Sequence, residues 1–201
     1  MDKEALENHK IYLQRLEFYR GFGYDLEKER EFILNAAMPL CGKILEIGTG
    51  KGHFALALAK KGFRFTSLDI SPAEQEIARL NLAFFGLEKQ VDFVIADAGK
   101  TDFPDAAFEV VFSVNVFHHL KNPQAVLGEV ARILRTGGKI VLSDFTDRGL
   151  EIINACHTHE GRHHDHFRYH LKDVKDYLTA KGFNIEQTQS EVQEVIIAHH
   201  Q

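Results

Sequence analysis

The chain has 201 residues, of which 44% are hydrophobic and 26% are charged, values that suit one globular domain with a substantial hydrophobic core. Its formal net charge is −5 and it has no basic block, which argues against a nucleic acid as partner. No apolar run approaches the roughly 20 residues that cross a bilayer, and the N-terminal MDKEALENHK lacks the apolar segment of a signal peptide. The two cysteines imply no disulfide framework. We therefore expect a cytoplasmic protein that does not associate with a membrane.

The predicted elements begin with two helices, an amphipathic one at 3–20 and a second at 25–38 that ends before Pro39. Strands then alternate with helices, which predicts an α/β fold with a mostly parallel sheet covered on both faces. The chain ends with a helix at 171–181 and a stretch, 184–200, that predicts a β-hairpin at the sheet edge. The alternating elements are strands at 43–48, 64–69, 91–96, 108–114 and 139–145, and helices at 53–61, 72–85 and 123–135.

The most informative stretch is 43–69, KILEIGTGKGHFALALAKKGFRFTSLD. Its order of strand, glycine turn, helix, strand and acid is typical of the first half of a nucleotide-binding α/β domain. Three glycines alternate from Gly48 to Gly52, and His53 stands where a dinucleotide-binding G-x-G-x-x-G motif has its last glycine. Glu46 would put a negative charge near a pyrophosphate, so it suits a ligand with an ammonium or sulfonium group better.

Four strand ends carry polar or glycine residues that suit a nucleoside-like ligand. In an open α/β sheet, ligands bind at the carboxyl ends of the strands, beside the point where the strand order reverses. The residues are Glu46 to Gly50 at the first end, Asp69 and Ile70 at the second, Asp97 and Ala98 at the third, and Asn115 at the fourth.

The segments around these strand ends resemble the class I S-adenosylmethionine-dependent methyltransferases, and most closely the type 11 group related to the ubiquinone-biosynthesis enzymes. The matching segments, in chain order, are ILEIGTGKGHFALALA, SLDISPAEQEIAR, VIADAGKTDFPDAAFEVVFSVNVFHHL and EVARILRTGGKIVLSDF. The resemblance implies a three-layer Rossmann-like fold with N-terminal helices and a seven-stranded, mostly parallel sheet whose last strand is antiparallel.

The same resemblance implies one methyltransferase domain over residues 1–201. Its expected parts are an N-terminal helical cap at 1–40, a cofactor-binding core at 41–145, a histidine-rich insertion on the acceptor side at 146–170, and a last helix with a β-hairpin at 171–201.

The resemblance also implies roles in binding S-adenosylmethionine. At the methionine end, Gly48, Thr49 and Gly50 would line the cofactor and Glu46 would organise it. At the nucleoside end, Asp69 would hold the ribose hydroxyls and Ile70 would pack on the adenine, while Asp97 would accept from the adenine amino group with Ala98 beside the ring. The last two predicted contacts, near the sulfonium, are Asn115 and Val116.

No catalytic residue follows from the motifs alone, because methyl transfer mainly requires the reactants to be held in line and water to be excluded. A hydroxyl or thiol acceptor benefits from a base, and histidine suits that task near neutral pH. The candidates are His157, His159 and His163, whereas the motif histidine His119 is interpreted as structural.

A histidine-rich segment, ACHTHEGRHHDHFRYH, departs from the family pattern. A helix would place His159, His163, His166 and His170 on one face, whereas a loop would let His157 and His159 converge with His163 and His164. Either geometry could hold zinc, iron, nickel or manganese, and a solvated lid without metal is the alternative. The predicted metal ligands are His157, His159, His163, His164 and His166.

The sequence therefore predicts a methyltransferase that transfers a methyl group from S-adenosylmethionine to a small-molecule acceptor. If the histidine-rich segment binds a divalent transition metal, that metal is a second cofactor. We expect a monomer or homodimer. The alternative function is a sensor or scaffold protein that binds S-adenosylmethionine or S-adenosylhomocysteine without transferring a methyl group.

Overall fold

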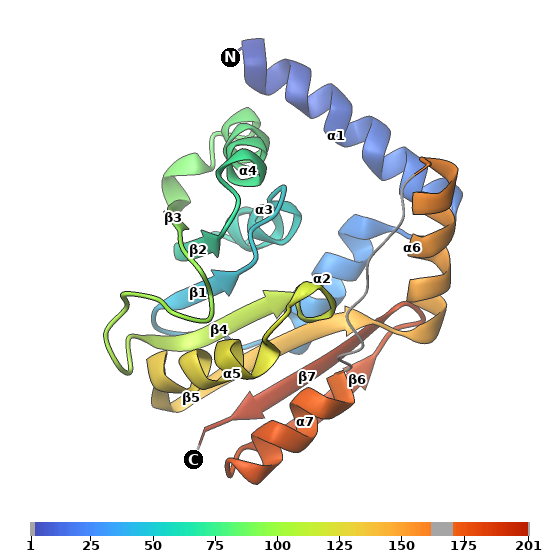
Figure 1. The fold of residues 1–201 in the computed structure, drawn as a ribbon. Coiled ribbons are helices and arrows are strands. Elements are labelled where there is room, and N and C mark those ends of the chain that lie inside the picture. Colours follow the sequence, from blue (N-terminus) through green and yellow to red (C-terminus); the bar gives the residue numbers. More distant parts are fainter. Residues whose placement is uncertain (1–2, 162–170, 201) are drawn as a thin grey trace.

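One seven-stranded sheet forms the centre of the molecule (Figure 1). The structure is a computed structural model that describes residues 3–161 and 171–200. The strands are β1 Ile44–Ile47, β2 Phe65–Asp69, β3 Val91–Ile95, β4 Phe108–Val114, β5 Leu134–Phe145, β6 Asn184–Gln189 and β7 Gln193–His199. Their order is β3-β2-β1-β4-β5-β7-β6, and β7 runs antiparallel to both of its neighbours while the other pairs are parallel. The predicted sheet is confirmed.

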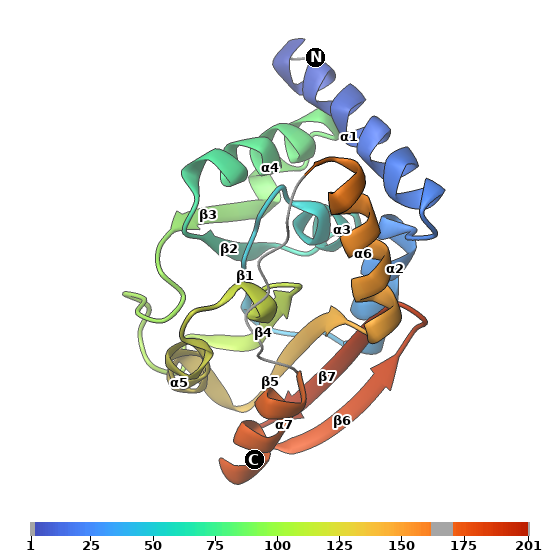
Figure 2. The ribbon, with the colours of Figure 1, turned by 45° about the vertical axis from the view of Figure 1, so that its right-hand side comes forward.

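Helices cover both faces of the sheet, as Figure 2 shows. They are α1 Lys3–Gly21, α2 Leu26–Ala36, α3 His53–Lys60, α4 Pro72–Phe84, α5 Pro123–Ile133, α6 Asp147–His159 and α7 Leu171–Ala180, with short 3-10 turns at Glu88–Gln90 and Phe117–His119. Neighbouring strand residues point into opposite cores: Ile44 packs with α2, α3 and α6, and Leu45 packs with α5 and α7. Both faces of β1 are therefore buried, which explains its continuous apolar run.

The predicted start of α4 is confirmed in detail. Ser71 is the N-cap, its side-chain oxygen accepts from the backbone N–H of Glu74 at 3.3 Å, and Pro72 occupies the first turn. Such a cap satisfies one of the backbone N–H groups that a helix leaves unpaired at its start.

β5 differs from its prediction. It begins at Leu134 instead of 139, and α5 ends at Ile133 instead of 135. Phe108 pairs with Leu134, and the register then shifts so that Val110 pairs with Lys139. The pair Gly137-Gly138 lies in this irregular stretch of strand, where a Cβ on Gly138 would come within 2.8 Å of the Glu109 carbonyl oxygen. The glycines thus allow close strand packing and do not simply end the helix.

The first part of the histidine-rich segment is helical. Thr146 caps α6 by accepting from the N–H of Gly149 at 3.1 Å, and α6 ends at His159, just before Gly161 with its φ of +68°. The alternative of one continuous helix from 159 onwards is therefore wrong, because α6 ends at His159, the first of the four histidines that such a helix would align. His163, His164, His166 and His170 lie outside the described residues.

The N-terminal helix α1 lies across the ends of α4 and α6 in both views (Figures 1 and 2). Asn8 donates to Asn81 on α4 at 2.7 Å, and Arg15 forms an ion pair with Glu160 just after α6. The described helices include none with the length and hydrophobicity that crossing a bilayer requires.

Candidate functional site

A cavity of about 540 Å³ opens at the carboxyl ends of β1, β2, β3 and β4. This edge of the sheet is where open α/β folds bind ligands, and the volume lies in the range of small-molecule sites. All ten residues predicted to bind the cofactor line this one cavity: Glu46, Gly48, Thr49, Gly50, Asp69, Ile70, Asp97, Ala98, Asn115 and Val116.

The glycine turn needs glycine for two different reasons. Gly48 has a φ of +83°, and a Cβ there would lie 2.2 Å from Cγ2 of Val116 on the next strand end. Gly52 has a φ of +77°, and its Cβ would lie 2.7 Å from that of Ala78, so it allows α3 to start close to α4. The turn can approach a ligand closely because its backbone carries no side chains at these points.

Two carboxylates lie at the carboxyl ends of β2 and β3, and backbone N–H groups hold both in place. Asp69 accepts from Gly50 at 2.7 Å and from Ser71 at 2.9 Å, and Asp97 accepts from Gly99 at 2.8 Å. A carboxylate has about four acceptor positions, so both side chains keep capacity for a ligand's hydroxyl or amino groups.

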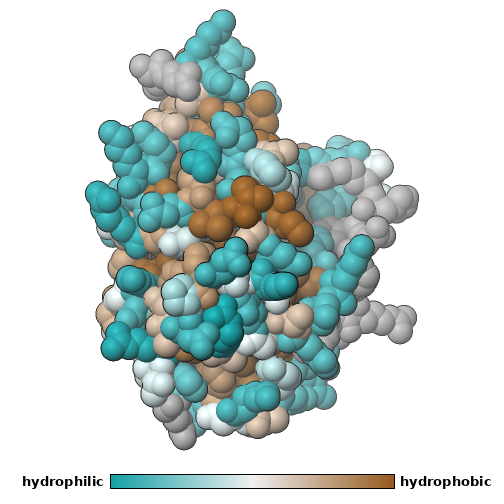
Figure 3. All heavy atoms as spheres, turned by 60° about the vertical axis from the view of Figure 1, so that its left-hand side comes forward, coloured by the Kyte–Doolittle hydropathy of each residue, from teal (hydrophilic) through white to brown (hydrophobic). Residues whose placement is uncertain are grey.

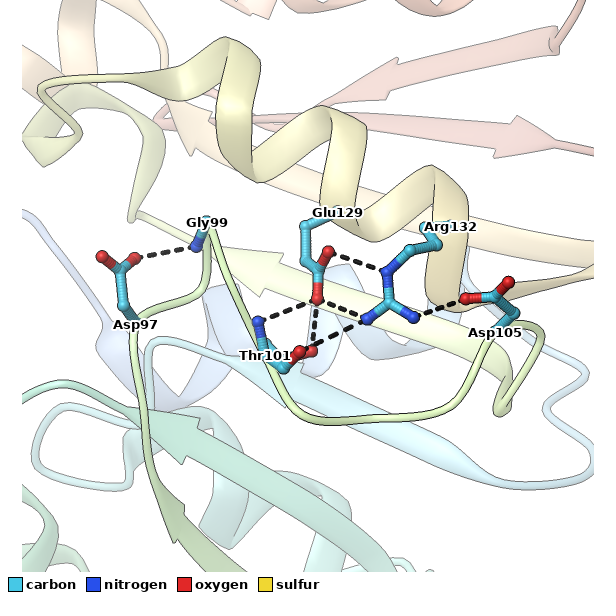
Figure 4. A network of polar contacts seen from close by, with 6 residues as sticks. All are labelled: Asp97, Gly99, Thr101, Asp105, Glu129 and Arg132. Carbon is cyan, nitrogen blue, oxygen red and sulfur yellow. Dashed lines mark hydrogen bonds and ion pairs between the residues drawn. The ribbon is translucent and has the colours of Figure 1, made fainter.

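The loop after β3 is held by α5 through a polar network (Figure 4). Glu129 accepts from the backbone N–H of Thr101 at 2.8 Å and from its hydroxyl at 2.5 Å, and Arg132 bridges Glu129 at 2.6 Å to Asp105 at 2.6 Å. The hydrogen bonds from Arg132 and then Thr101 lower the pKa of Glu129 to about 2. The network fixes the loop that begins at Asp97.

A buried polar chain lies beneath the glycine turn. Ser67 donates to Glu46 at 2.5 Å and lies 2.6 Å from the hydroxyl of Thr49, which also accepts from Gln75 at 3.2 Å. Burial raises the pKa of Glu46 to about 8, and the Ser67 hydrogen bond offsets part of that rise. Burial thus favours the protonated form of Glu46.

Arg30 of α2 reaches the same cavity from outside the motif region. The Arg30 residue is 8% exposed, its guanidinium donates to the Tyr24 hydroxyl at 3.0 Å, and its buried Nε has no hydrogen-bond partner among the described residues. The positive charge of Arg30 acts to lower the pKa of Glu46, which lines the same cavity. The cavity wall thus offers one cationic and one acidic group, both available to a ligand. Sequence reasoning missed Arg30, and an arginine on a helix gives no signal that would have singled it out.

Two motif histidines lie on different sides of one turn. His118 is buried, and its Nδ1 lies 2.6 Å from Oδ1 of Asp144 on β5, whereas His119 is exposed and lines the cavity. The structural interpretation of His119 stays a prediction. His53, which opens α3, is half-buried and stacks on Tyr12, and burial lowers its pKa to about 3, so it stays neutral.

The histidines of α6 lie apart from this cavity. The ring of His159 packs against Phe18 of α1 and against Phe22 just after that helix, with centroids 5.8 Å and 5.6 Å away. Neither His157 nor His159 is among the residues that line the cavity. Within residues 3–161 and 171–200, no three histidine, cysteine or acidic side chains gather in a metal-binding arrangement. The roles proposed for His157, His159 and His163 stay predictions.

Comparisons with known proteins bear on this site. Residues 45–142 match a family model described as a methyltransferase domain. The demethylmenaquinone methyltransferase of Thermus thermophilus is 35% identical over 127 residues, which cover 62% of this chain and 57% of that enzyme. The ubiquinone biosynthesis O-methyltransferase of Idiomarina loihiensis is 33% identical over 114 residues, covering 56% and 46%. The match therefore spans about half the length of each relative.

Solved structures share the fold over most of the chain. The (4+2)-cyclase SpnF has a TM-score of 0.69 at 15% identity and covers 87% of this chain and 81% of its own. A methyltransferase from Aquifex aeolicus that depends on S-adenosylmethionine has a TM-score of 0.65 at 18% identity, with coverages of 85% and 88%. At such identities these likenesses concern the fold alone, and the likeness to a family rests on the sequence matches. Residues 45–142 of the chain match a methyltransferase domain, and the chain is similar in sequence and in fold to S-adenosylmethionine-dependent methyltransferases.

Proposed function

We propose that this protein transfers a methyl group from S-adenosylmethionine to a small-molecule acceptor. The observation that carries the proposal is that one cavity at the carboxyl ends of the strands is lined by all ten residues the sequence motifs select. The acidic net charge of −5 agrees with a neutral or cationic acceptor and disfavours a nucleic acid.

The nucleoside half of the cofactor fits the side of the cavity formed by β2 and β3. Asp69 would accept hydrogen bonds from the ribose hydroxyls, and Asp97 would accept one from the adenine amino group. Ile70 is 71% exposed and lines the cavity, so an adenine ring with Ala98 on its edge would cover apolar surface that is otherwise in water.

The amino-acid half fits the side formed by the glycine turn and α2. Its ammonium would lie towards Glu46 and its carboxylate towards Arg30, since both side chains line the cavity. The Nε of Arg30 is buried without a hydrogen-bond partner among the described residues, and a ligand carboxylate would accept from it.

The chain's contribution to catalysis is positioning and the exclusion of water. The cofactor supplies an activated methyl group on a sulfonium. Asn115 and Val116 would lie near the sulfonium, and the left-handed φ of +57° at Asn115, held by its N–H bond to Ser143 at 2.8 Å, fixes this strand end. Holding reactants in line lowers barriers by roughly 7–11 kcal/mol.

Calorimetric titration with S-adenosylhomocysteine tests the ribose assignment in Asp69→Asn. Hydrogen bonds to a charged group contribute about 1.5–3 kcal/mol, so the affinity should fall by about tenfold or more. Asp92→Asn changes an exposed acid of β3 outside the cavity and should bind as the unaltered protein does. Equal affinity in the Asp69 variant and this control would remove Asp69 from the site.

A second function, binding of the cofactor without methyl transfer, follows from the same cavity. The similarity to SpnF supports this second function, because that protein is described as a (4+2)-cyclase and not as a methyltransferase although it shares this fold. Product analysis separates the two functions: methyl transfer yields S-adenosylhomocysteine and a methylated acceptor, whereas pure binding returns intact cofactor.

A further inference from the structure

Four polar side chains form one buried chain of hydrogen bonds beneath the glycine turn. The register of the sheet places Ser67 on β2 directly beside Glu46 on β1. The Oγ of Ser67 lies 2.5 Å from Oε2 of Glu46 and 2.6 Å from Oγ1 of Thr49, and Nε2 of Gln75 lies 3.2 Å from the same Oγ1. Each of the four residues is 4% exposed or less, so their polar groups depend on one another for hydrogen bonds.

Gln75 sets the direction of this chain. It belongs to α4, which lies beside β2 and β3 in Figures 1 and 2, and its Nε2 donates to the backbone carbonyls of Ser67 at 3.0 Å and Val94 at 2.9 Å. Carbonyl oxygens only accept, so the nitrogen end of the amide is the end that faces Thr49 and donates to it. Each hydroxyl has one hydrogen, so Thr49 donates its own to Ser67, and Ser67 donates its own to Glu46.

The direction matters because the chain ends on a donor that faces a carboxyl group. A hydroxyl hydrogen that points at Glu46 stabilises the ionised form of that side chain. Burial raises the pKa of Glu46 to about 8, and the hydrogen bond from Ser67 is the largest effect in the opposite direction. Thr49 and Gln75 strengthen that bond, since hydrogen bonds in a chain polarise one another.

Other groups around Glu46 act on it independently of this chain. Beyond burial and the serine, Arg30 of α2 lowers its pKa, Asp69 at the end of β2 raises it, and a backbone N–H of α3 lowers it. Its neighbour on β4 is the uncharged Phe112, and burial keeps His53 of α3 neutral. These groups stay in place when the serine hydroxyl is removed, so the effect of the hydroxyl can be measured alone.

We propose that Ser67, oriented by Thr49 and Gln75, is a positioning residue for the ammonium group of S-adenosylmethionine. The chain holds Glu46 as a carboxylate, and this carboxylate attracts the ammonium group, which a protonated Glu46 would not do. The inference rests on the proposed binding of S-adenosylmethionine. It assigns part of the selectivity for an amino group to Ser67 and Gln75, which are not among the residues that line the cavity.

The test compares S-adenosylhomocysteine with its analogue in which hydrogen replaces the amino group, by calorimetric titration. Both ligands keep the carboxylate, so any contact with Arg30 is the same for both. At pH 7, Ser67→Ala should weaken S-adenosylhomocysteine by about tenfold, because a hydrogen bond to a charged group is lost, and should leave the analogue unchanged. The loss should shrink as the pH rises, because Glu46 then ionises without the help of Ser67.

Two further variants complete the comparison. Gln75→Leu removes the first donor of the chain and leaves Ser67 in place, so it should show the same pattern with a smaller loss. Ser113→Ala changes a buried serine of β4 whose hydroxyl has no hydrogen-bond partner among the described residues. This matched control should bind both ligands as the unaltered protein does.

Binding of the analogue shows that each variant still forms the cavity. Unchanged affinity of Ser67→Ala for S-adenosylhomocysteine, an equal loss for both ligands, or a loss of the same size at every pH would overturn the proposal. If Ser67→Ala does not fold, the comparison of Gln75→Leu with Ser113→Ala decides, and equal affinities for S-adenosylhomocysteine would overturn it. If the unaltered protein binds neither ligand, the proposed function itself fails.

Discussion

At the scale of single residues, two buried ionisable side chains, Arg30 and Glu46, bear most directly on ligand binding. Arg30 is 8% exposed and burial raises the pKa of Glu46, so both side chains are largely withdrawn from water. Both line one cavity, where a ligand with an ammonium and a carboxylate would offer each of them a charged partner.

The Arg30 assignment is tested by comparing two ligands. Arg30→Gln should weaken S-adenosylhomocysteine by about tenfold or more, since a charge-assisted hydrogen bond is lost. It should leave methylthioadenosine unchanged, because that compound lacks the amino-acid carboxylate. Arg64→Gln, on an exposed arginine, is the control for both ligands. An equal loss for the two ligands would mean that Arg30 supports the cavity wall and does not bind the carboxylate.

Glu46 predicts a pH dependence of binding. Burial raises its pKa to about 8, whereas a nearby ammonium group favours the carboxylate, so binding of a ligand with an ammonium should release a proton. The affinity for S-adenosylhomocysteine should therefore rise as the pH rises towards that pKa and level off above it. Calorimetry in two buffers of different ionisation enthalpy measures the released proton directly. In Glu46→Gln the proton release should vanish, and its persistence would assign it to another group.

At the scale of helices and strands, the parts of the site that follow from short-range sequence patterns could be predicted. The order of strands and helices, the N-cap at Ser71 and the ten cavity residues follow from short-range patterns, because the carboxyl ends of parallel strands meet at one edge. Arg30 escaped prediction because α2 joins the site only through tertiary packing. The His118–Asp144 pair escaped prediction because its members are 26 positions apart, one in the 3-10 turn after β4 and the other on β5. The extension of β5 escaped prediction because a glycine pair in a sequence is a turn signal.

The α6 element limits the metal hypothesis. His159 packs against the rings of Phe18 and Phe22, and His163 lies outside the described residues, so the metal stays a prediction. The metal hypothesis predicts a stoichiometric amount of a transition metal in protein purified without a histidine tag, measured by elemental mass spectrometry. His163→Gln should lose that metal and His199→Gln should keep it. Metal-free protein that still binds the cofactor would leave the segment as a polar lid.

At the scale of the whole molecule, the cavity proposed for the cofactor lies at the carboxyl ends of β1 to β4, beside the point where the strand order reverses. Figure 3 shows that the face on the β3 side is largely hydrophilic around a hydrophobic patch, and Ile70 and Ile95, at the ends of β2 and β3, are among the exposed large hydrophobic residues. A bound adenine would cover the first of them.

The central claim is that this chain binds S-adenosylmethionine in the cavity at the strand ends, and titration of the purified protein with S-adenosylhomocysteine tests it most directly. The account predicts saturable binding at a single site per chain, with heat that is unchanged when NAD is present in excess. Absence of binding to S-adenosylhomocysteine, or displacement of it by NAD, would contradict the account.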